Sequence, residues 1–435
     1  MKRKLIKQIF AEWRSNIWLF LEMLIVSLVL WYINDFLYAV YSVRAEPDGF
    51  DTENVYKMHY TVDWSKVEWP ESDSGYMRLR DSINTDQMRK LMERLKAEPG
   101  VEAVSANFGI TPHNYNFQGD ALIDVEDSTL VLGGMNWNMV RNSWVFGDIC
   151  SVLGIKGING ETSRQLDDML AQGKSVITSN VRYNKENLPK EEQIDSRKVV
   201  GKRFYVGNGH NAIVTIGAVV APIKRATYES ATDMITILIP GREMFGDYLG
   251  GEVLVRVKDS YPGDFAQEMH SRLATDYSFK YLYLTDVESM SEIKTFNNRQ
   301  VDQQQRMYIA MCIFLMVNIF LGLLGSFWFR TQQRGAEIAI RMVHGATPLR
   351  VLMRVVSEAM LLLVATLPFT IGVVWLMVTK EGLLTSSQVY DDMLLPTVAT
   401  GLLTYAEMGV MVLLGTLFPA LKSMHTKPSV VLQEE

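Results

Sequence analysis

The chain has 435 residues, of which 48% are hydrophobic and 21% are charged. This composition is too apolar for a disordered chain and too charged for a bundle that lies wholly in a membrane, so it predicts parts of both kinds. The net charge of −6 argues against a general nucleic-acid-binding protein, because neutralising phosphates requires a basic surface. Cys150 and Cys312 are the only cysteines, so neither a disulfide framework nor a cysteine-ligated metal site is expected.

Four stretches are long and apolar enough to cross a membrane, which takes about 20 helical residues. We expect the transmembrane helices at 17–41, 308–329, 355–378 and 394–418. The first stretch could instead be a secretory signal peptide, because it follows a basic leader, residues 1–16. Its apolar part is longer than that of an ordinary signal peptide, and no small-residue cleavage site follows it. A retained membrane anchor is therefore favoured.

The positions of Lys and Arg predict the orientation, because cytoplasmic loops contain an excess of these residues. Residues 1–16 and the loop 330–354 are basic, whereas the loop 379–393 has Lys380 as its only cation, beside several acids. We therefore expect the leader, the loop 330–354 and the tail 419–435 on the cytoplasmic side. The short loop 379–393 and the large segment after the first helix are expected on the opposite side.

Residues 42–285 have the pattern of a folded α+β domain. Apolar residues at helical spacing predict a helix over 86–96, which Pro99-Gly100 ends. Alternating apolar and polar residues predict strands at 101–105, 175–178, 214–220, 234–239 and 253–257. The charge-rich stretch 185–198 predicts a solvated loop or helix. The expected fold is thus an α-helical membrane protein with four transmembrane helices and an α+β extracytoplasmic domain inserted between the first two.

Residues 286–307 lead into the second membrane segment without an early Pro or Gly, which predicts one long stalk helix. Val287, Met290, Ile293 and Phe296 form a narrow apolar stripe on it. Such a stripe favours packing against another helix, and an ordinary amphipathic linker helix would show the same pattern.

The chain lacks the motifs of common catalytic sites. Gly173-Lys174-Ser175 resembles the end of a phosphate-binding loop, but Asp168 stands where the first glycine is needed and a strand pattern follows. The six histidines have no metal-ligand spacing, and no G-x-S-x-G motif is present. We therefore expect a non-catalytic subunit that binds no metal or cofactor itself.

Three acidic residues fall within the predicted membrane segments, namely Glu22, Glu358 and Glu407. Ionisable groups at membrane depth are costly and are often functional. Glu22 and Glu358 lie near the cytoplasmic ends of their segments, where interfacial solvation explains them. Glu407 lies nearer mid-span among small residues, where it can face another helix or subunit, and a functional role is one interpretation of it.

Residues 334–348 predict a short helix that ends at a glycine and is followed by a Thr-Pro helix start. Glu337 and Arg341 are four residues apart in the order that favours an ion pair, while Ile338 and Met342 share another face that a small loop cannot bury. This face favours a partner protein, and a helix resting on lipid is the alternative. The candidate contact residues are Arg334, Glu337, Ile338, Arg341, Met342, Gly345 and Thr347.

At these residues the chain resembles the MacB-type and FtsX-type permeases of ABC transporters. The resemblance rests on the run 334–345 with Glu358, on Pro99-Gly100-Val101, on Val200-Gly201-Lys202 before the strand at 214–220, and on the tail residues Gly415, Pro419-Ala420, Lys427-Pro428-Ser429-Val430 and Leu432. It covers nearly the whole chain, and the loop and tail motifs are specific only in combination.

The resemblance implies a permease of the bacterial inner membrane that works as a homodimer or heterodimer with a separate ABC ATPase, which binds ATP and magnesium. In such permeases the loop 330–354 couples to the ATPase, and stalk helices relay motion to periplasmic domains to drive efflux. MacB-type proteins often have the ATPase fused ahead of the permease, whereas this chain begins at the membrane helix. Whether a periplasmic adaptor and an outer-membrane duct take part stays open.

Two other functions within the resemblance stay open as alternatives. One is an FtsX-like signalling subunit that activates a cell-wall hydrolase, although such proteins generally have a much shorter extracytoplasmic domain. The other is a lipoprotein-extracting subunit of the LolC/LolE type, which has the same topology. The sequence does not identify the substrate.

Overall fold

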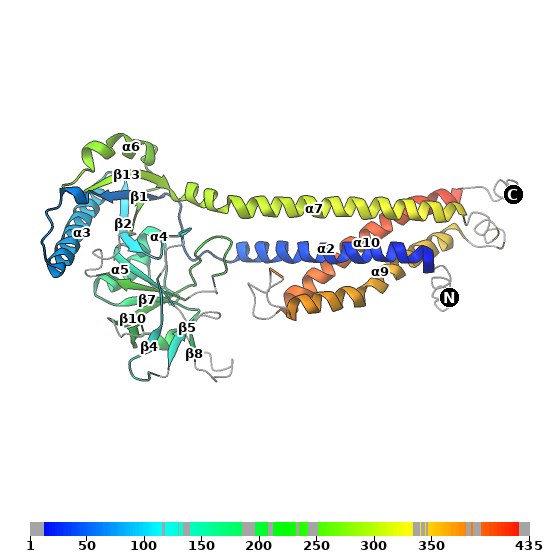
Figure 1. Cartoon of the computed structure of the whole chain (residues 1–435), viewed down its shortest axis with the longest axis horizontal. Coiled ribbons are helices and arrows are strands. Elements are labelled where there is room, and N and C mark those ends of the chain that lie inside the picture. The colour runs from blue at the N-terminus through cyan, green and yellow to red at the C-terminus, as the bar shows by residue number, and fades with distance from the viewer. Residues whose placement is uncertain are drawn as a thin grey trace. The chain divides into compact units, whose positions relative to one another are not determined.

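The structure is a computed structural model, which describes residues 13–114, 118–128, 130–133, 140–184, 196–207, 212–231, 235–241, 251–333, 340, 344, 347–379, 384–385 and 393–425. The chain divides into two compact units. The helical unit consists of Met1–Ser42 and Gln300–Glu435, and the strand-rich domain is Val43–Arg299. Figure 1 shows the elements of both units.

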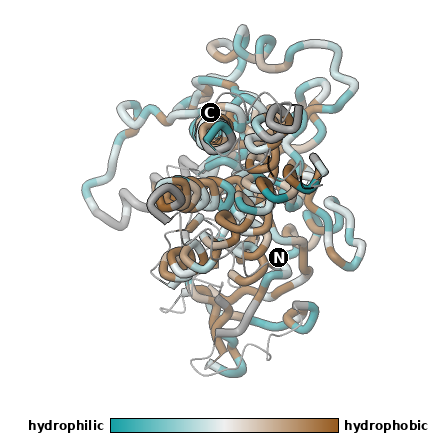
Figure 2. The backbone as a smooth tube through the Cα atoms, turned by 90° about the vertical axis from the view of Figure 1, so that its right-hand side faces the viewer, coloured by the Kyte–Doolittle hydropathy of each residue, from teal (hydrophilic) through white to brown (hydrophobic). Residues whose placement is uncertain are grey.

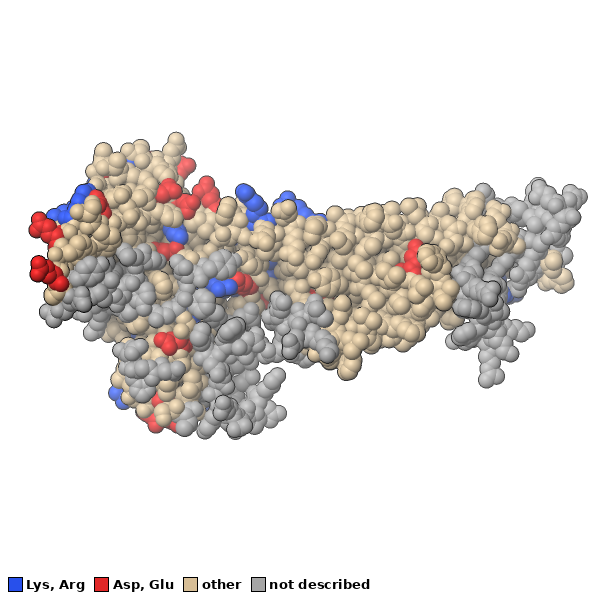
Figure 3. All heavy atoms as spheres, in the orientation of Figure 1, with Lys and Arg blue, Asp and Glu red and all other residues tan. Residues whose placement is uncertain are grey.

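Among the described residues, four helices are long and apolar enough to span a membrane, as the sequence predicts. They are α2 (Trp13–Ala45), α7 (Met290–Gln333), α9 (Pro348–Thr379) and α10 (Leu394–His425). Large apolar side chains such as Phe314, Trp375 and Leu402 are 63–70% exposed on them, as expected for helices that face lipid. Figure 2 shows the predominance of hydrophobic residues along these helices, and Figure 3 shows few charged side chains on their visible face. The chain is a multi-pass membrane protein.

The four helices share one apolar core. Its buried residues are Leu19, Met23, Val26 and Leu30 of α2, Ile319, Leu323 and Phe327 of α7, Ala359, Leu362 and Leu363 of α9, and Met408 and Val412 of α10. Gly415 lets α10 approach α7 closely, because a Cβ atom there would lie 2.8 Å from the Cβ of Leu323. The helices are therefore packed as one bundle.

The strand-rich domain is built on a four-stranded antiparallel sheet with the order β13-β1-β12-β2. The elements of this part are β1 (Val55–Val62), η1 (Trp64–Lys66), α3 (Asp73–Lys96), β2 (Val101–Phe108), β12 (Glu252–Val257), α6 (Phe265–Asp276) and β13 (Leu282–Ser289). Helix α3 links β1 to β2, and α6 links β12 to β13. Two interleaved β-α-β units of this kind form the ferredoxin-like arrangement.

Alternating side chains of this sheet enter two different cores. Val104 and Val255 face α3 and α6, where they pack with Leu91, Leu95 and Met269. On the other face, Val55, Ala103 and Leu254 pack with the short helices α4 (Ile149–Leu153) and α5 (Ser163–Ala171). Both faces of the sheet are therefore buried, which accounts for the consecutive apolar residues of its strands, such as Val253-Leu254-Val255.

A second group of strands is inserted between β2 and β12 and extends the sheet beyond β2. Its elements are β3 (Gln118–Asp120), β4 (Leu122–Asp124), β5 (Val131–Gly133), β6 (Val140–Gly147), β7 (Ser175–Thr178), β8 (Arg182–Asn184), η3 (Ser196–Val199), β9 (Arg203–Val206), β10 (Ala212–Val220) and β11 (Thr236–Pro240). Its own apolar core includes Phe204, Val214 and Ile237. This insertion separates the two β-α-β units in sequence.

The expected helix end and strands are present. Helix α3 ends at Lys96, and the turn between it and β2 contains Gly100, which has a left-handed φ of +86°. All five predicted strands occur, and α3 begins well before the predicted start at Asp86. Of the charged stretch, residues 185–195 lie outside the described residues.

The predicted stalk is one continuous helix with the second membrane segment, but it begins later than expected. Residues 286–289 belong to β13, and α7 starts at Met290. Val287 is therefore a core residue of the sheet and not part of a helical stripe. The pairing of β13 with β1, which periodicity alone does not show, overrides the helical pattern of this short segment.

Candidate functional site

Most of the predicted coupling residues lie outside the part of the chain that the structure describes, namely Arg334, Glu337, Ile338, Arg341, Met342 and Gly345. Thr347 is described and is exposed. Its carbonyl oxygen accepts hydrogen bonds from the N–H groups of Arg350 (2.9 Å) and Val351 (3.3 Å), and α9 begins at Pro348. The expected Thr-Pro helix start is thus present, and the coupling role stays a prediction.

The three acidic residues of the membrane segments lie on three different helices. Glu22 of α2 is half-buried against Gly322 of α7, where a Cβ atom would lie 2.1 Å from its Oε1. Glu358 of α9 is 4% exposed. Glu407 of α10 is half-buried, and its Oε2 accepts a hydrogen bond of 2.9 Å from Nδ2 of Asn34 on α2.

Asn34 belongs to a row of polar side chains on one face of α2, which we call the polar ladder. The row links α2 to its neighbours through Ser27 Oγ with Thr370 Oγ1 (3.1 Å), Trp31 Nε1 to Thr400 Oγ1 (2.9 Å) and Asn34 Nδ2 to Thr404 Oγ1 (3.0 Å). Ser27, Trp31 and Asn34 are spaced by four and three residues, so they face the same way. Because each such bond contributes about 0.6–2 kcal/mol in a membrane, the ladder fastens α2 to α9 and α10.

A cavity of about 540 Å³ lies within the helical unit beside Glu407. It is lined by Asn34, Leu37, Tyr38, Tyr41, Ser42, Ile309, Cys312, Ile313, Leu403 and Glu407. Its walls are mostly apolar, and the amide of Asn34 with the carboxylate of Glu407 supplies the main polar group. This chemistry suits an apolar molecule that also carries a hydrogen-bonding group.

The Asn34→Leu variant is expected to lower the free energy of unfolding by about 1–3 kcal/mol, because it removes the donor to both Thr404 and Glu407 and leaves a carboxylate in the bundle without that bond. Thermal unfolding of the purified chain in detergent measures the change. Ser27→Ala is the matched control, since it removes one hydroxyl pair and no bond to a carboxylate. An equal loss in the two variants would contradict a special role for the Asn34–Glu407 pair.

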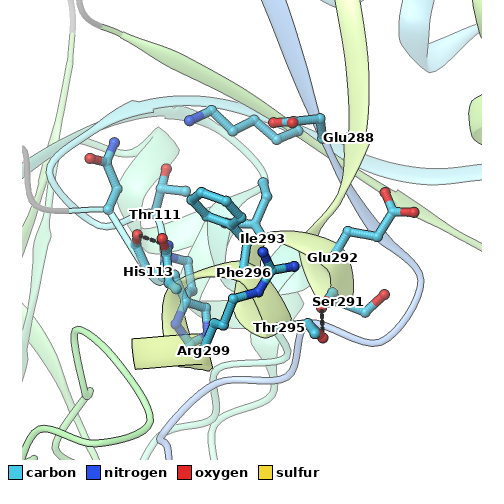
Figure 4. A pocket seen from close by; sticks show the side chains of 13 residues that line it. Thr111, His113, Glu288, Ser291, Glu292, Ile293, Thr295, Phe296 and Arg299 are labelled. Atoms are coloured by element: carbon cyan, nitrogen blue, oxygen red, sulfur yellow. Dashed lines mark hydrogen bonds between the residues drawn. The ribbon is translucent and has the colours of Figure 1, made fainter. Parts of the chain in front are cut away.

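A second cavity, of about 670 Å³, lies within the strand-rich domain at the start of α7 (Figure 4). It is lined by Lys57, Thr111, Pro112, His113, Asn114, Glu288, Ser291, Glu292, Ile293, Thr295, Phe296, Asn297 and Arg299. Phe296 is 68% exposed, and the guanidinium of Arg299 lies 5.6 Å from the centre of its ring. The first turns of α7 thus form one wall of this cavity.

His113 connects this cavity wall to the rest of the domain through its backbone. Its N–H donates to the carbonyl oxygen of Arg225 (2.7 Å), and its own carbonyl oxygen accepts from Nδ2 of Asn297 on α7 (2.7 Å). The residue has a left-handed φ of +61°, which is uncommon for a residue with a side chain. The strained backbone is therefore held by bonds on both sides.

The imidazole of His113 is buried and neutral. The side chain is packed edge-on against Phe50, and neither ring nitrogen has a hydrogen-bond partner among the described residues. Its pKa is lowered to about 4, chiefly by burial and also by the ammonium of Lys294, while the carboxylate of Asp48 opposes this shift. The ring therefore stays uncharged near neutral pH.

No group of three His, Cys, Asp or Glu side chains in the described part could hold a metal ion. Cys150 is buried, and burial together with the neighbouring Asp167 raises its pKa well above the usual range, so it is a poor nucleophile. Cys312 lines the cavity beside Glu407.

Sequence reasoning missed several of the residues that the structure brings together. Asn34 was visible as a polar residue inside an apolar segment, which is the signal for an interhelical contact. Nothing in the sequence indicates that His113 is buried, because its burial depends on Phe50 and on α7, which are both distant in sequence. Glu407 was among the candidate residues that the sequence predicts, whereas its hydrogen-bond partner Asn34 was not.

Comparison of the sequence with protein-family models and with curated proteins gives no match.

Proposed function

We propose that the chain is the permease subunit of an ATP-driven transporter of the MacB type, in the bacterial inner membrane with both termini cytoplasmic. It transmits the motion of a separate ATPase, which binds ATP and magnesium, to the strand-rich domain and so drives extrusion of a substrate. A second permease subunit completes the assembly. The resemblance of the loop and tail motifs and the charge pattern of the loops support this proposal.

One observation carries the proposal, and it is the continuity of α7. This helix has 44 residues, which at about 1.5 Å per residue gives a rod of about 66 Å. It begins directly after Ser289, the last residue of β13, and its first residue, Met290, is fully buried in the domain core. Since no flexible linker separates sheet and helix, a displacement of α7 must displace β13.

The cavity beside Glu407 supports a second candidate, a lipoprotein-extracting subunit of the LolC/LolE type. Its apolar walls would suit an acyl chain, and the Asn34–Glu407 pair would suit a polar group next to that chain. The two candidates use the same ATPase coupling and differ in the substrate. An FtsX-like signalling role has no observation of this kind in its favour.

Copurification tests the proposed function. Tagged full-length chain, extracted from its own membranes in mild detergent, is expected to bring down an ABC ATPase, and the complex should hydrolyse ATP. The chain purified away from that ATPase should show no turnover. Absence of any ATPase from the copurified material would overturn the proposal. ATP hydrolysis by the chain alone would overturn it as well.

A further inference from the structure

The end of α2 is fastened to the loop 221–231 of the strand-rich domain by a buried lysine. The side chain of Lys224 is 0% exposed. Its Nζ donates to the carbonyl oxygens of Val43 (2.7 Å) and Glu46 (2.7 Å) and to Oδ1 of Asp48 (3.1 Å). An ammonium has three N–H donors, so all of them are used. The ammonium of Lys224 thus binds both the last turn of α2, at Val43, and the residues that follow it, Glu46 and Asp48.

Residues 46–49, which follow α2, are held closely against this loop. The backbone N–H of Lys224 donates to the carbonyl oxygen of Asp48 (3.0 Å), and the carboxylate of Glu46 accepts from Oγ of Ser230 (3.1 Å). Gly49 has a φ of +77°, and a Cβ atom there would lie 2.2 Å from the carbonyl oxygen of Pro222. Only glycine allows the chain to run this close to the loop.

The first turns of α7 are joined to the same loop. The second carboxylate oxygen of Asp48 lies 3.7 Å from Nζ of Lys294 on α7. Asn297, one turn further on, donates to the carbonyl oxygen of His113, whose N–H donates to Arg225 in the loop. Helix α2 is therefore fastened to residues 221–231 directly, and α7 is connected to them through Asp48 and His113.

The contacts of Lys224 and Lys294 differ in strength. Lys294 is 38% exposed and its distance to Asp48 is long, so this ion pair contributes little. Lys224 is buried, and moving its acceptors away would leave an uncompensated charge inside the protein, which is strongly unfavourable. The end of α2 and the loop must therefore move together, whereas the Lys294 contact can open.

We infer that Lys224 is a positioning residue for the force transmission proposed above: it makes the end of α2 and the loop 221–231 one rigid piece, so that movement of α2 reaches β10 and the domain. This inference rests on the proposed function. Without the Lys224 ammonium, the backbone bond between residues 224 and 48 and the Glu46–Ser230 bond would remain as weaker contacts, and we expect these to yield when α2 moves.

Hydrogen exchange of the full-length chain in complex with its ATPase, with and without a non-hydrolysable ATP analogue, tests the inference. In the wild type, nucleotide should change the exchange of α2 and also that of residues 212–231. Lys224→Met should keep the change in α2 and the ATPase rate, and lose the change in 212–231. Lys294→Met, which removes the weak contact, is the matched control and should behave as wild type.

The outcomes separate this role from others. A lysine that merely stabilises the domain would, when replaced, raise exchange equally in both nucleotide states and leave the nucleotide-dependent difference in 212–231 intact, which would overturn the inference. If Lys224→Met does not fold, Lys224→Gln serves instead, because its amide cannot hold all three acceptors. An unchanged difference in that variant overturns the inference as well. A wild type without any nucleotide effect, even in α2, would contradict the proposed function itself.

Discussion

The full-length chain is expected to lose about 3 kcal/mol of unfolding free energy through His113 as the pH falls from about 6.5 to about 4. The folded protein holds the pKa of this imidazole at about 4, below the ordinary value of 6.5, chiefly because the ring is buried. Between these pH values the unfolded chain binds a proton that the folded chain does not. The stabilisation is therefore complete above about 6.5, declines through this interval and is lost below about 4.

Comparison with His113→Asn isolates this effect from other titrating groups. Asn tolerates the left-handed backbone that this position requires, and its backbone can keep the bonds to Arg225 and Asn297. His59 and His270, which pair with carboxylates, stay in both proteins. Denaturant unfolding at several pH values should give a difference between the two profiles that grows toward pH 4. Parallel profiles would mean that His113 is not desolvated.

The membrane helices and several strands could be predicted because each depends on a local pattern. A run of about 20 apolar residues has no stable alternative to a membrane or a core, so the four helices follow from the sequence. The segment Val253–Val257 is nearly all apolar because both sheet faces are covered by different cores. The helix end at Lys96 follows from Pro99-Gly100.

The sheet order could not be predicted, because it depends on pairs that are far apart in sequence. Met58 of β1 pairs with Val253 of β12 on one side and with Val287 of β13 on the other. In β1, Lys57 and His59 alternate with Tyr56, Met58 and Tyr60, which is a local strand pattern, but their partners Glu252 and Glu288 come from those same distant strands. Nothing local identifies the strands with which such a strand pairs.

The same reason explains which functional candidates were found. Glu407 is conspicuous in any apolar segment, since an acid there needs an explanation. Lys224 looks like an ordinary surface lysine of a loop, because its three acceptors belong to a segment more than 170 residues earlier. A buried charge becomes visible only when the partners that neutralise it are placed around it.

The second large effect is expected at the loop between α7 and α9, at residues that the structure does not describe. If Ile338 and Met342 insert into a groove of the ATPase, Ile338→Asp places an unpaired charge in that groove. An unpaired buried charge in an interface costs about 2–5 kcal/mol, which corresponds to an affinity loss of tens to thousands of fold. The variant should stay folded in the membrane and fail to bring down the ATPase.

The same substitution at Ile340 is the matched control. Ile340 is 49% exposed, and two residues along a helix place it on the side opposite to Ile338. Ile340→Asp should therefore retain the ATPase, so that added charge in the loop is not itself the cause of a loss. If this helix rests on lipid instead, Ile338→Asp would weaken its contact with the membrane and leave the binding of the ATPase unchanged. Wild-type recovery of the ATPase with Ile338→Asp would thus refute the coupling role and leave the lipid-resting helix as the explanation of this apolar face.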